Sequence, residues 1–325
     1  MRPFWRCPWT WAILLLALGL RGAGISRDLP WHGNQHEHAC FRDLHHMAHT
    51  LGKPWADMRP PLFTYVWGLA MLPVGAAGMW LGFLESPRAF VDAYTLHPSL
   101  FYLTGRFLSL LFGILAVLRL GRLAEGRYGG LAGRIAMLIL AVDPHHILVS
   151  QTADCTAMSI WMFLVALGAA LRYAAGAEAF RAVLWAGFLC GVAGATKELS
   201  GLALLALLGM ILQREGFRPA RMLQACAAAA LGYVLANPWA LLRWRDSLRH
   251  LVNLMAWQHV ESADGGVVGH LDFWGRTAAW ASTFPWVLRV AAPLLVLWIL
   301  WRLPKDRVLA GFAAGYTLFF VLFGD

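Results

Sequence analysis

Charged residues are scarce in this chain. Only 14% of its 325 residues are Asp, Glu, Lys or Arg, whereas 59% are apolar and the mean hydropathy is +0.56. Soluble domains are about one quarter charged and at most half apolar. These values exclude an ordinary soluble globular protein. Several apolar runs reach the ~17–25 residues that cross a bilayer, so we expect an all-α polytopic membrane protein with a single membrane domain over 1–325.

Lysine is the scarcest charged residue type, with three residues among the 27 basic ones, and the formal net charge is +9. A basic excess can indicate nucleic-acid binding, but most of these charges lie in short connections between apolar runs. Membrane proteins have this pattern because their cytoplasmic loops are basic. We therefore expect a membrane as partner and no nucleic acid. The five cysteines are scattered and odd in number, so no disulfide framework is implied.

The apolar runs and their flanking charges define an orientation. Arg2 and Arg6 precede the run at 9–24, which places the N-terminus in the cytoplasm; a cleavable signal peptide is the alternative, because Gly22-Ala23-Gly24 offers small residues to a peptidase. Further runs lie at 62–84, 98–118, 131–150, 157–171, 183–197, 198–212, 222–240, 284–301 and 308–323. Four connections are rich in basic residues and should be cytoplasmic: 119–134, 172–181, 214–221 and 302–307.

The run at 9–24 ends outside the membrane, and the run at 98–118 must begin outside to end at its arginine-rich connection. The run at 62–84 lies between them, so it cannot make a single crossing. The run contains Pro73 and several glycines, so we expect an interfacial or re-entrant segment; a true span, with the first run misassigned, is the alternative. About nine spanning helices result, with juxtamembrane helices in the first outer loop. The outer segments are 25–97, 151–156 and 241–283, and the turn at Thr196-Lys197-Glu198 faces the same side.

The stretch at 27–68, within the first outer segment, is the most polar part of the chain and contains six of the twelve histidines. His36 and His38 flank Glu37 and could bind a divalent metal. His45 and His49 resemble the ends of the HExxH zincin motif, but the glutamate that would act as base is missing, which excludes a metalloprotease. An amphipathic helix at the headgroup level is the competing interpretation. A divalent metal site and an amphipathic helix are therefore the two alternatives here, and no other cofactor is implied.

Candidates for acid–base chemistry are Glu37, Asp57 and Asp154, because a carboxyl group beside apolar groups at a membrane surface can act near neutral pH. Asp154 is also expected to cap the helix that starts at Cys155. Lys197 interrupts a long apolar stretch, as a functional residue or a tight turn, and could bind a phosphate. Three arginines expected outside could form an anion site for a lipid phosphate or an ordinary solvated face: Arg243, Arg245 and Arg249.

Six motifs follow one another in an order that resembles a known family. They are ADMRPPLFTYVWG, TGRFLSLLFGILAV, AVDPHHILVSQTADCTAMSIW, GFLCGVAGATKELSGLALL, ANPWALLRW and AWQHVESADGGVVGHLDFWGRTAAWASTFPWVL, and they cover most of 25–301. The chain resembles the polyprenyl-phosphate-dependent membrane glycosyltransferases of the C-type fold, specifically glycosyltransferase family 39, which includes protein O-mannosyltransferases and the aminoarabinose lipid A transferase. The resemblance implies an active site at the outer membrane face, reached under juxtamembrane helices.

The resemblance also implies roles for individual residues. The outer-loop catalytic carboxylate of the family matches the neighbourhood of Glu37, the second-loop aspartate matches Asp154 and the Thr-Lys turn matches Thr196-Lys197. The Lys-Pro pair of the family corresponds to Arg59-Pro60, and its late-loop histidine to His259. Relatives usually carry Asp-Glu where this chain has Asn34-Gln35 or His36-Glu37, so the base is either Glu37 or absent.

The leading hypothesis is a glycosyltransferase in the bacterial inner membrane. It would move a sugar from a polyprenyl-phosphate carrier to a lipid, glycan or protein acceptor, and we expect inversion at the anomeric centre. The sites expected are catalytic Glu37, Asp57 and Asp154; donor-phosphate-binding Arg59, Lys197, Arg243, Arg245 and Arg249; substrate-binding His36, His38, Tyr65 and His259. A transporter or lipid flippase that uses Lys197 and Glu198 is one alternative. An inactive or accessory relative of the glycosyltransferase is the other.

Overall fold

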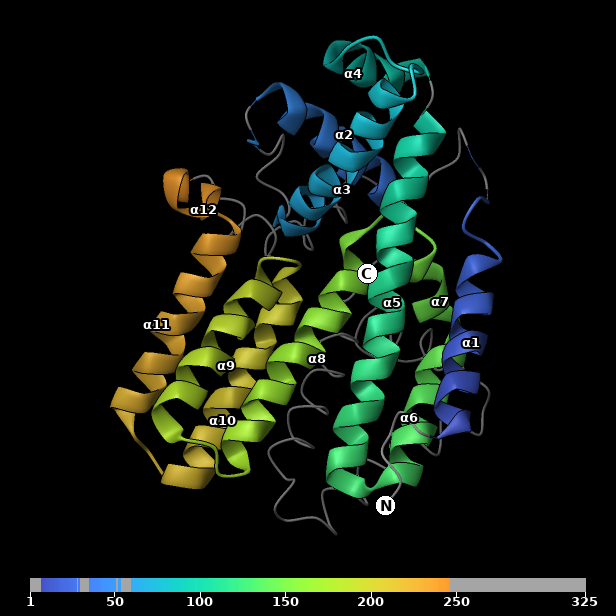
Figure 1. Ribbon diagram of the computed structural model, residues 1–325. Helices are drawn as coiled ribbons and strands as arrows, with labels where there is room; N and C mark the ends of the chain where they lie inside the picture. Colours follow the sequence, from blue (N-terminus) through green and yellow to red (C-terminus); the bar gives the residue numbers. More distant parts are fainter. Residues whose placement is uncertain are drawn as a thin grey trace, which may run out of the picture.

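The structure is a computed structural model that describes residues 7–27, 29, 35–50, 52–53, 60–96 and 98–245. Within these ranges the chain forms helices and turns and no strand, which confirms the all-α expectation. The elements, in chain order (Figure 1), are α1 (Pro8–Gly22), α2 (Gln35–His49), α3 (Leu62–Trp80), α4 (Pro87–Leu96), α5 (Pro98–Tyr128), α6 (Gly130–Val142), α7 (Pro144–Ser150), α8 (Cys155–Ala174), α9 (Ala179–Gly194), the 3-10 helix η2 (Glu198–Leu202), α10 (Ala203–Glu215), α11 (Pro219–Ala236) and α12 (Trp239–Leu242).

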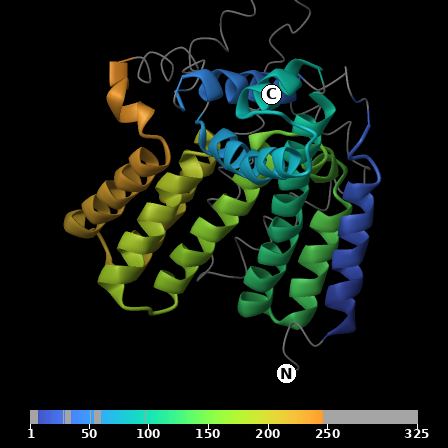
Figure 2. The ribbon, with the colours of Figure 1, turned by 45° about the horizontal axis from the view of Figure 1, so that its top comes forward.

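The long helices form a bundle, and α2, α3 and α4 lie across one of its ends (Figure 2). By length and composition α3, α5 and α8 could each cross a membrane, and α6 with α7 adds a fourth if the bent pair is one span. The chain is therefore a helical membrane protein. The expected spans at 284–301 and 308–323 lie outside the described residues.

Helix α3 combines two properties. Its length and apolar composition are those of a membrane span. It nevertheless lies with α2 and α4 across the end of the bundle (Figures 1 and 2). Phe63, Trp67 and Met71 are buried against the other helices, whereas Leu69 and Leu72 are about two-thirds exposed. The two sides of α3 therefore face different environments, protein on one side and the exterior on the other.

Helix α5 is longer than the sequence pattern predicts. The apolar run at 98–118 continues as helix to Tyr128, and a tight turn at Gly129, with φ of 92°, leads directly into α6. Glycine adopts this left-handed conformation without the steric penalty of a side chain. Arg119, Arg122 and Arg127 are thus on the last turns of a helix rather than in the expected loop.

The predicted run at 131–150 is not one helix. It breaks at Asp143-Pro144, and α6 and α7 meet at an angle of 64°. Pro144 has no backbone N–H and its ring obstructs a continuing helix, so a helix ends before it. The side chain of Asp143 accepts a hydrogen bond from the His146 backbone N–H at 2.6 Å and so begins α7.

The remaining helices follow the expected pattern. The turn predicted at 196–198 separates α9 from η2 and α10. Small residues let α9 and α11 approach closely, because a Cβ at Gly191 would strike the backbone oxygen of Ala229 and one at Gly232 the backbone oxygen of Phe188. Such contacts between small residues are typical of helices packed in membranes.

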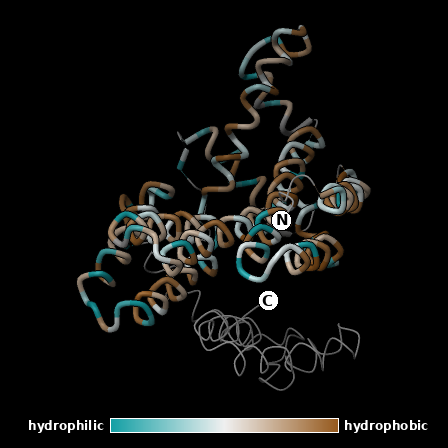
Figure 3. Tube along the Cα trace, turned by 60° about the horizontal axis from the view of Figure 1, so that its bottom comes forward, coloured by the Kyte–Doolittle hydropathy of each residue, from teal (hydrophilic) through white to brown (hydrophobic). Residues whose placement is uncertain are grey.

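Apolar residues also cover much of the outside of the bundle. Leu15, Leu205 and Leu231 are each more than half exposed. Figure 3 shows apolar residues along the bundle helices and hydrophilic ones concentrated at several of the connections. A soluble protein rarely exposes apolar surface on this scale, so this surface fits contact with lipid.

Candidate active site at the α2 end of the bundle

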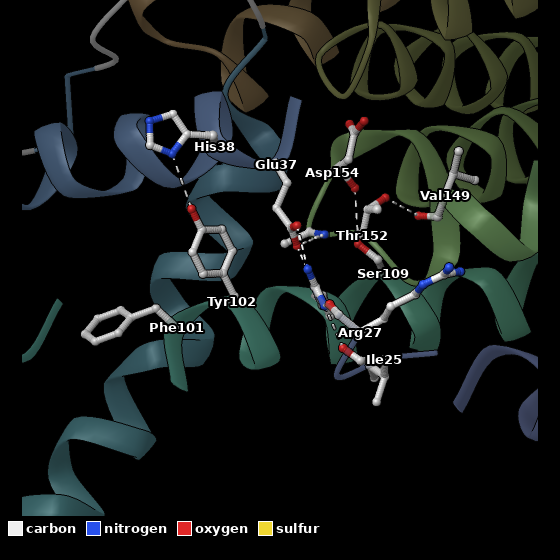
Figure 4. Close-up of polar contacts among 12 residues, drawn as sticks. Ile25, Arg27, Glu37, His38, Phe101, Tyr102, Ser109, Val149, Thr152 and Asp154 are labelled. Carbon is white, nitrogen blue, oxygen red and sulfur yellow. Dashed lines mark hydrogen bonds and ion pairs between the residues drawn. The ribbon is translucent and has the colours of Figure 1, made fainter. Parts of the chain in front are cut away.

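A buried ion pair joins the first outer segment to the bundle. Glu37 on α2 is 0% exposed and Arg106 on α5 is 3% exposed. The Arg106 guanidinium donates from Nε to Oε1 at 2.7 Å and from Nη2 to Oε2 at 2.8 Å (Figure 4). This two-bond geometry is the strong form of the arginine–carboxylate interaction.

Further hydrogen bonds extend this pair to two other segments. The Ala153 backbone N–H donates to Glu37 Oε1 at 2.8 Å, which attaches the loop before α8. Arg106 Nη1 donates to the carbonyl oxygens of Ile25 at 3.0 Å and Arg27 at 2.7 Å, which attaches the chain after α1. The Glu37 carboxylate is 0% exposed and accepts three hydrogen bonds, so a substrate hydroxyl has no access to it. Glu37 is therefore placed to hold the site together.

Asp154 lies next to this pair along the chain. It is the N-cap of α8, as the sequence predicts: its Oδ1 accepts from the Thr156 backbone N–H at 3.1 Å. Ser109 on α5 donates from Oγ to the Asp154 carbonyl oxygen at 3.2 Å. The carboxyl groups of Asp154 and Glu37 point in different directions (Figure 4), so the two groups have separate surroundings.

Lys197 reaches the same place from the other half of the bundle. It precedes η2, and its Nζ lies 3.4 Å from the Thr156 hydroxyl. Thr196, fully buried, fixes the turn by donating from its hydroxyl to the Ala193 carbonyl at 2.6 Å. Asp154 and Lys197 therefore meet at Thr156, one through its backbone and the other through its side chain. At this position the Asp154 carboxylate can accept a proton, and the Lys197 ammonium group can bind an anion.

The metal expected at His36 and His38 stays a prediction, because the side chain of His36 lies outside the described structure. Among the side chains that the structure describes, no group of three His, Cys, Asp or Glu residues is arranged to hold a metal ion. His38 is exposed, and its Nδ1 lies 3.4 Å from the Tyr102 hydroxyl. The rings of His45 and His49 contact each other edge to face, with centroids 4.7 Å apart. Burial, with His49 and His46 nearby, lowers the pKa of His45 below its ordinary value.

The other expected binding residues are distributed around this end. The Tyr65 hydroxyl on α3 is buried close to the Trp239 side chain on α12. Trp239 donates from Nε1 to the Gly52 carbonyl at 3.0 Å, which ties α12 to the segment after α2. Arg243 and Arg245 follow α12 at this end (Figure 1), and the Arg245 guanidinium lies 5.5 Å from the centroid of the Trp244 ring. The expected residues Asp57, Arg59, Arg249 and His259, and the side chain of His36, lie outside the described structure.

Two residues in this region were missed by the sequence reasoning. Arg106 is the only charged residue within the run at 98–118, and an isolated arginine in an apolar run indicates a buried partner. Arg21 is also fully buried and bonds to the Ala141 carbonyl at 2.9 Å and to His146 Nδ1 at 2.6 Å, which joins α1 to the bent pair α6 and α7. Neither partner could be named without the tertiary structure.

No protein-family model, curated protein or solved structure matches this chain. The family membership expected from the sequence motifs therefore stays a prediction.

Proposed function

We propose that this protein is a membrane glycosyltransferase that uses a polyprenyl-phosphate sugar as donor. The observation that carries the proposal is the convergence of Asp154 and Lys197 on Thr156 at the end of the bundle. This end is covered by α2, α3 and α4, which matches the arrangement implied by the family resemblance. The described part of the bundle belongs, in this proposal, to a C-type fold with about nine spans.

The reaction assigns one task to each group. The Asp154 carboxylate takes the proton of the acceptor hydroxyl, whose oxygen forms a new bond to the anomeric carbon of the sugar. The bond from that carbon to the phosphate oxygen breaks, and the lipid phosphate leaves with both electrons. Lys197 stabilises its negative charge. Attack opposite the leaving group inverts the anomeric centre.

Glu37 has a positioning role in this scheme, in place of the role as base considered from the sequence. Its carboxylate is sealed by Arg106 and by the Ala153 N–H. Because Ala153 directly precedes Asp154, the ion pair fixes the start of α8 against α5. Loss of the pair would move Asp154 rather than remove a reacting group.

The orientation of the site follows from the charges. The connections at 172–181 and 214–221, which are rich in arginine, lie at the end of the bundle opposite α2 and α4 (Figure 1). Under the positive-inside rule the arginine-rich end is cytoplasmic. The proposed site is then extracytoplasmic, at the outer face of a bacterial inner membrane, where polyprenyl-phosphate sugars can meet a lipid, glycan or protein acceptor.

The test is sugar transfer in proteoliposomes supplied with a panel of undecaprenyl-phosphate-linked hexoses and pentoses. We expect Asp154→Asn to lower turnover about 100-fold or more, because general acid–base catalysis contributes about that factor. Lys197→Gln should raise the KM for the donor. Asp143→Asn is the matched control, since Asp143 caps α7 in the same way but is not part of the site. Full activity of both the Asp154 and Lys197 variants would reject the proposed site.

A transporter is the rival function. Transporters bind their substrate near the bilayer midplane, whereas Lys197 lies at the turn that follows the end of α9. A cysteine placed at 197 should react with a membrane-impermeant maleimide from the outside only. Reaction from both sides would favour transport. Absence of transfer with every donor, together with outside-only labelling, would favour an inactive or accessory relative.

A further inference from the structure

A second candidate binding site lies at the opposite end of the bundle from Asp154 and Lys197. The start of α9, the connection from α10 to α11 and the first turns of α11 line an open cavity of about 530 Å³, which is within the range of small-molecule sites. Two kinds of side chain line it: the aromatic rings of Phe180 and Phe217, and the polar groups of Arg218, Arg221 and Gln224.

Arg221 is held in place before any ligand arrives. Its guanidinium lies 5.9 Å from the centroid of the Phe180 ring, and its Nη1 donates to Gln224 Oε1 at 3.1 Å. Its Nε lies 3.6 Å from Glu215 Oε2. Arg218 is less constrained, with a side chain that is 64% exposed and an Nε 3.9 Å from the same Glu215 oxygen.

The cavity therefore carries an excess of positive charge. Glu215 is shared between Arg218 and Arg221, and its other oxygen accepts from the Tyr173 hydroxyl at 2.8 Å. Arg214, by contrast, donates to the Tyr173 carbonyl at the end of α8, and its guanidinium lies over the Tyr173 ring. Its charge therefore interacts with groups of the protein itself. One carboxylate facing two arginines leaves one positive charge for an external anion.

We propose that this cavity binds the phosphate headgroup of an anionic phospholipid in the adjacent leaflet. The arginines supply charged donors for the phosphate. Phe217, 75% exposed, and Phe180, 49% exposed, supply apolar contact for the glycerol and upper acyl chain beside them. A free anion would use only the charged half of this surface, whereas a phospholipid uses both. The site is separate from the proposed transferase site and does not depend on it.

The experiment measures thermal unfolding of the full chain in neutral detergent, with phosphatidylglycerol, phosphatidylcholine or inorganic phosphate added. We expect phosphatidylglycerol to raise the melting temperature more than phosphatidylcholine does, and phosphate to have no effect. Arg218→Gln should weaken the apparent affinity for phosphatidylglycerol about fivefold, which corresponds to about 1 kcal/mol for one arginine at an anionic lipid surface. Phe217→Ser should weaken binding of both lipids.

Arg181→Gln is the matched control, because Arg181 is 84% exposed, belongs to the same end of α9 and does not line the cavity. It should keep the affinity of the unmodified chain. Arg218 is well exposed and Arg221 remains to pair with Glu215, so Arg218→Gln should fold normally. Equal stabilisation by both lipids, an unchanged affinity in Arg218→Gln, or the same effect from inorganic phosphate would overturn the proposal.

Discussion

At the α2 end of the bundle the side chains of Arg106 and Glu37 are 4% and 0% exposed, whereas Arg181 and Glu178 at the other end are 84% and 69% exposed. Removing charges from water is costly unless they are paired and fully hydrogen-bonded, and Arg106 and Glu37 meet this condition. Exposed pairs contribute little because water and salt screen them. The buried charges at the α2 end therefore stabilise the fold, whereas the exposed charges at the other end can interact with solvent, lipid or ligands.

The largest expected effect is the loss of the buried cation. Arg106→Met leaves the Glu37 carboxylate buried without its partner and should lower the free energy of unfolding by about 3–5 kcal/mol. The measurement is unfolding in mixed micelles titrated with a denaturing detergent. Arg181→Met is the control, because the Arg181 side chain is 84% exposed, and it should change stability by less than about 0.5 kcal/mol.

The double variant Glu37→Leu/Arg106→Met sharpens this test. Replacing both charges removes the unpaired carboxylate, so most of the lost stability should return. A double variant as unstable as Arg106→Met alone would show that the hydrogen bonds of Arg106 to Ile25 and Arg27, rather than the ion pair, hold this end together.

The next effect compares two glycines on α5. A Cβ at Gly105 would lie 2.6 Å from the Ala153 Cβ and from the Trp67 ring, so Gly105→Ala should cost about 1–3 kcal/mol through overpacking. Gly126, near the other end of α5, has no atom within 4 Å of such a Cβ. Gly126→Ala should stabilise the helix by about 0.5–1 kcal/mol. Melting temperatures that shift in the same direction for both variants would contradict the close packing described here.

A smaller effect compares two helix N-caps. Asp154→Ala removes the hydrogen bond to the Thr156 N–H and should cost about 1 kcal/mol, whereas Asp154→Asn keeps the cap and should be nearly neutral. Glu178 precedes α9 at the other end without a side-chain capping bond, so Glu178→Ala should change little. Measuring both stability and transfer activity distinguishes the capping role of Asp154 from its proposed catalytic role. Of these three variants, only Asp154→Asn should keep its stability and lose activity.

The smallest effect is a dependence of stability on pH. The pKa of His45 is lowered in the folded protein by burial, His49 and His46, so the unfolded chain binds a proton more readily. The contribution of His45 to the free energy of unfolding is fully present above the ordinary pKa of 6.5, and it is lost as the pH falls below that value. The melting temperature should therefore decline between about pH 7 and 5, and less steeply in His45→Gln. The arginines of the other end stay charged throughout this range. An identical slope in His45→Gln would assign the pH dependence to other groups.

Local patterns in the sequence predicted several features that the structure confirms. Asp154 caps α8, and the polar turn at 196–198 separates two apolar helices. Both features depend on residues close in sequence. The break before Pro144 could have been predicted in the same way, because proline restricts the preceding residue. The sequence pattern does not indicate the extension of α5 to Tyr128, because arginines flanking an apolar run are also typical of a cytoplasmic loop.

Three residues of the candidate site could be singled out from the sequence, but Arg106 and the contacts among these residues could not. Glu37, Asp154 and Lys197 stand out because ionisable residues are few in this chain. Nothing in the local sequence indicates that Arg106, 69 residues from Glu37, seals that carboxylate. Without this partner, Glu37 resembles a base; with it, our proposal gives Glu37 a positioning role.

The sequence by itself determined that this is an all-α membrane protein, because long apolar runs with few charges have no other stable arrangement in a bilayer. It also determined the helix starts and turns that depend on neighbouring residues. Only the tertiary structure decided which charges are buried in pairs and which remain exposed. The physical reason is that the energy of a charge depends on its surroundings, and those are assembled from segments far apart in the chain.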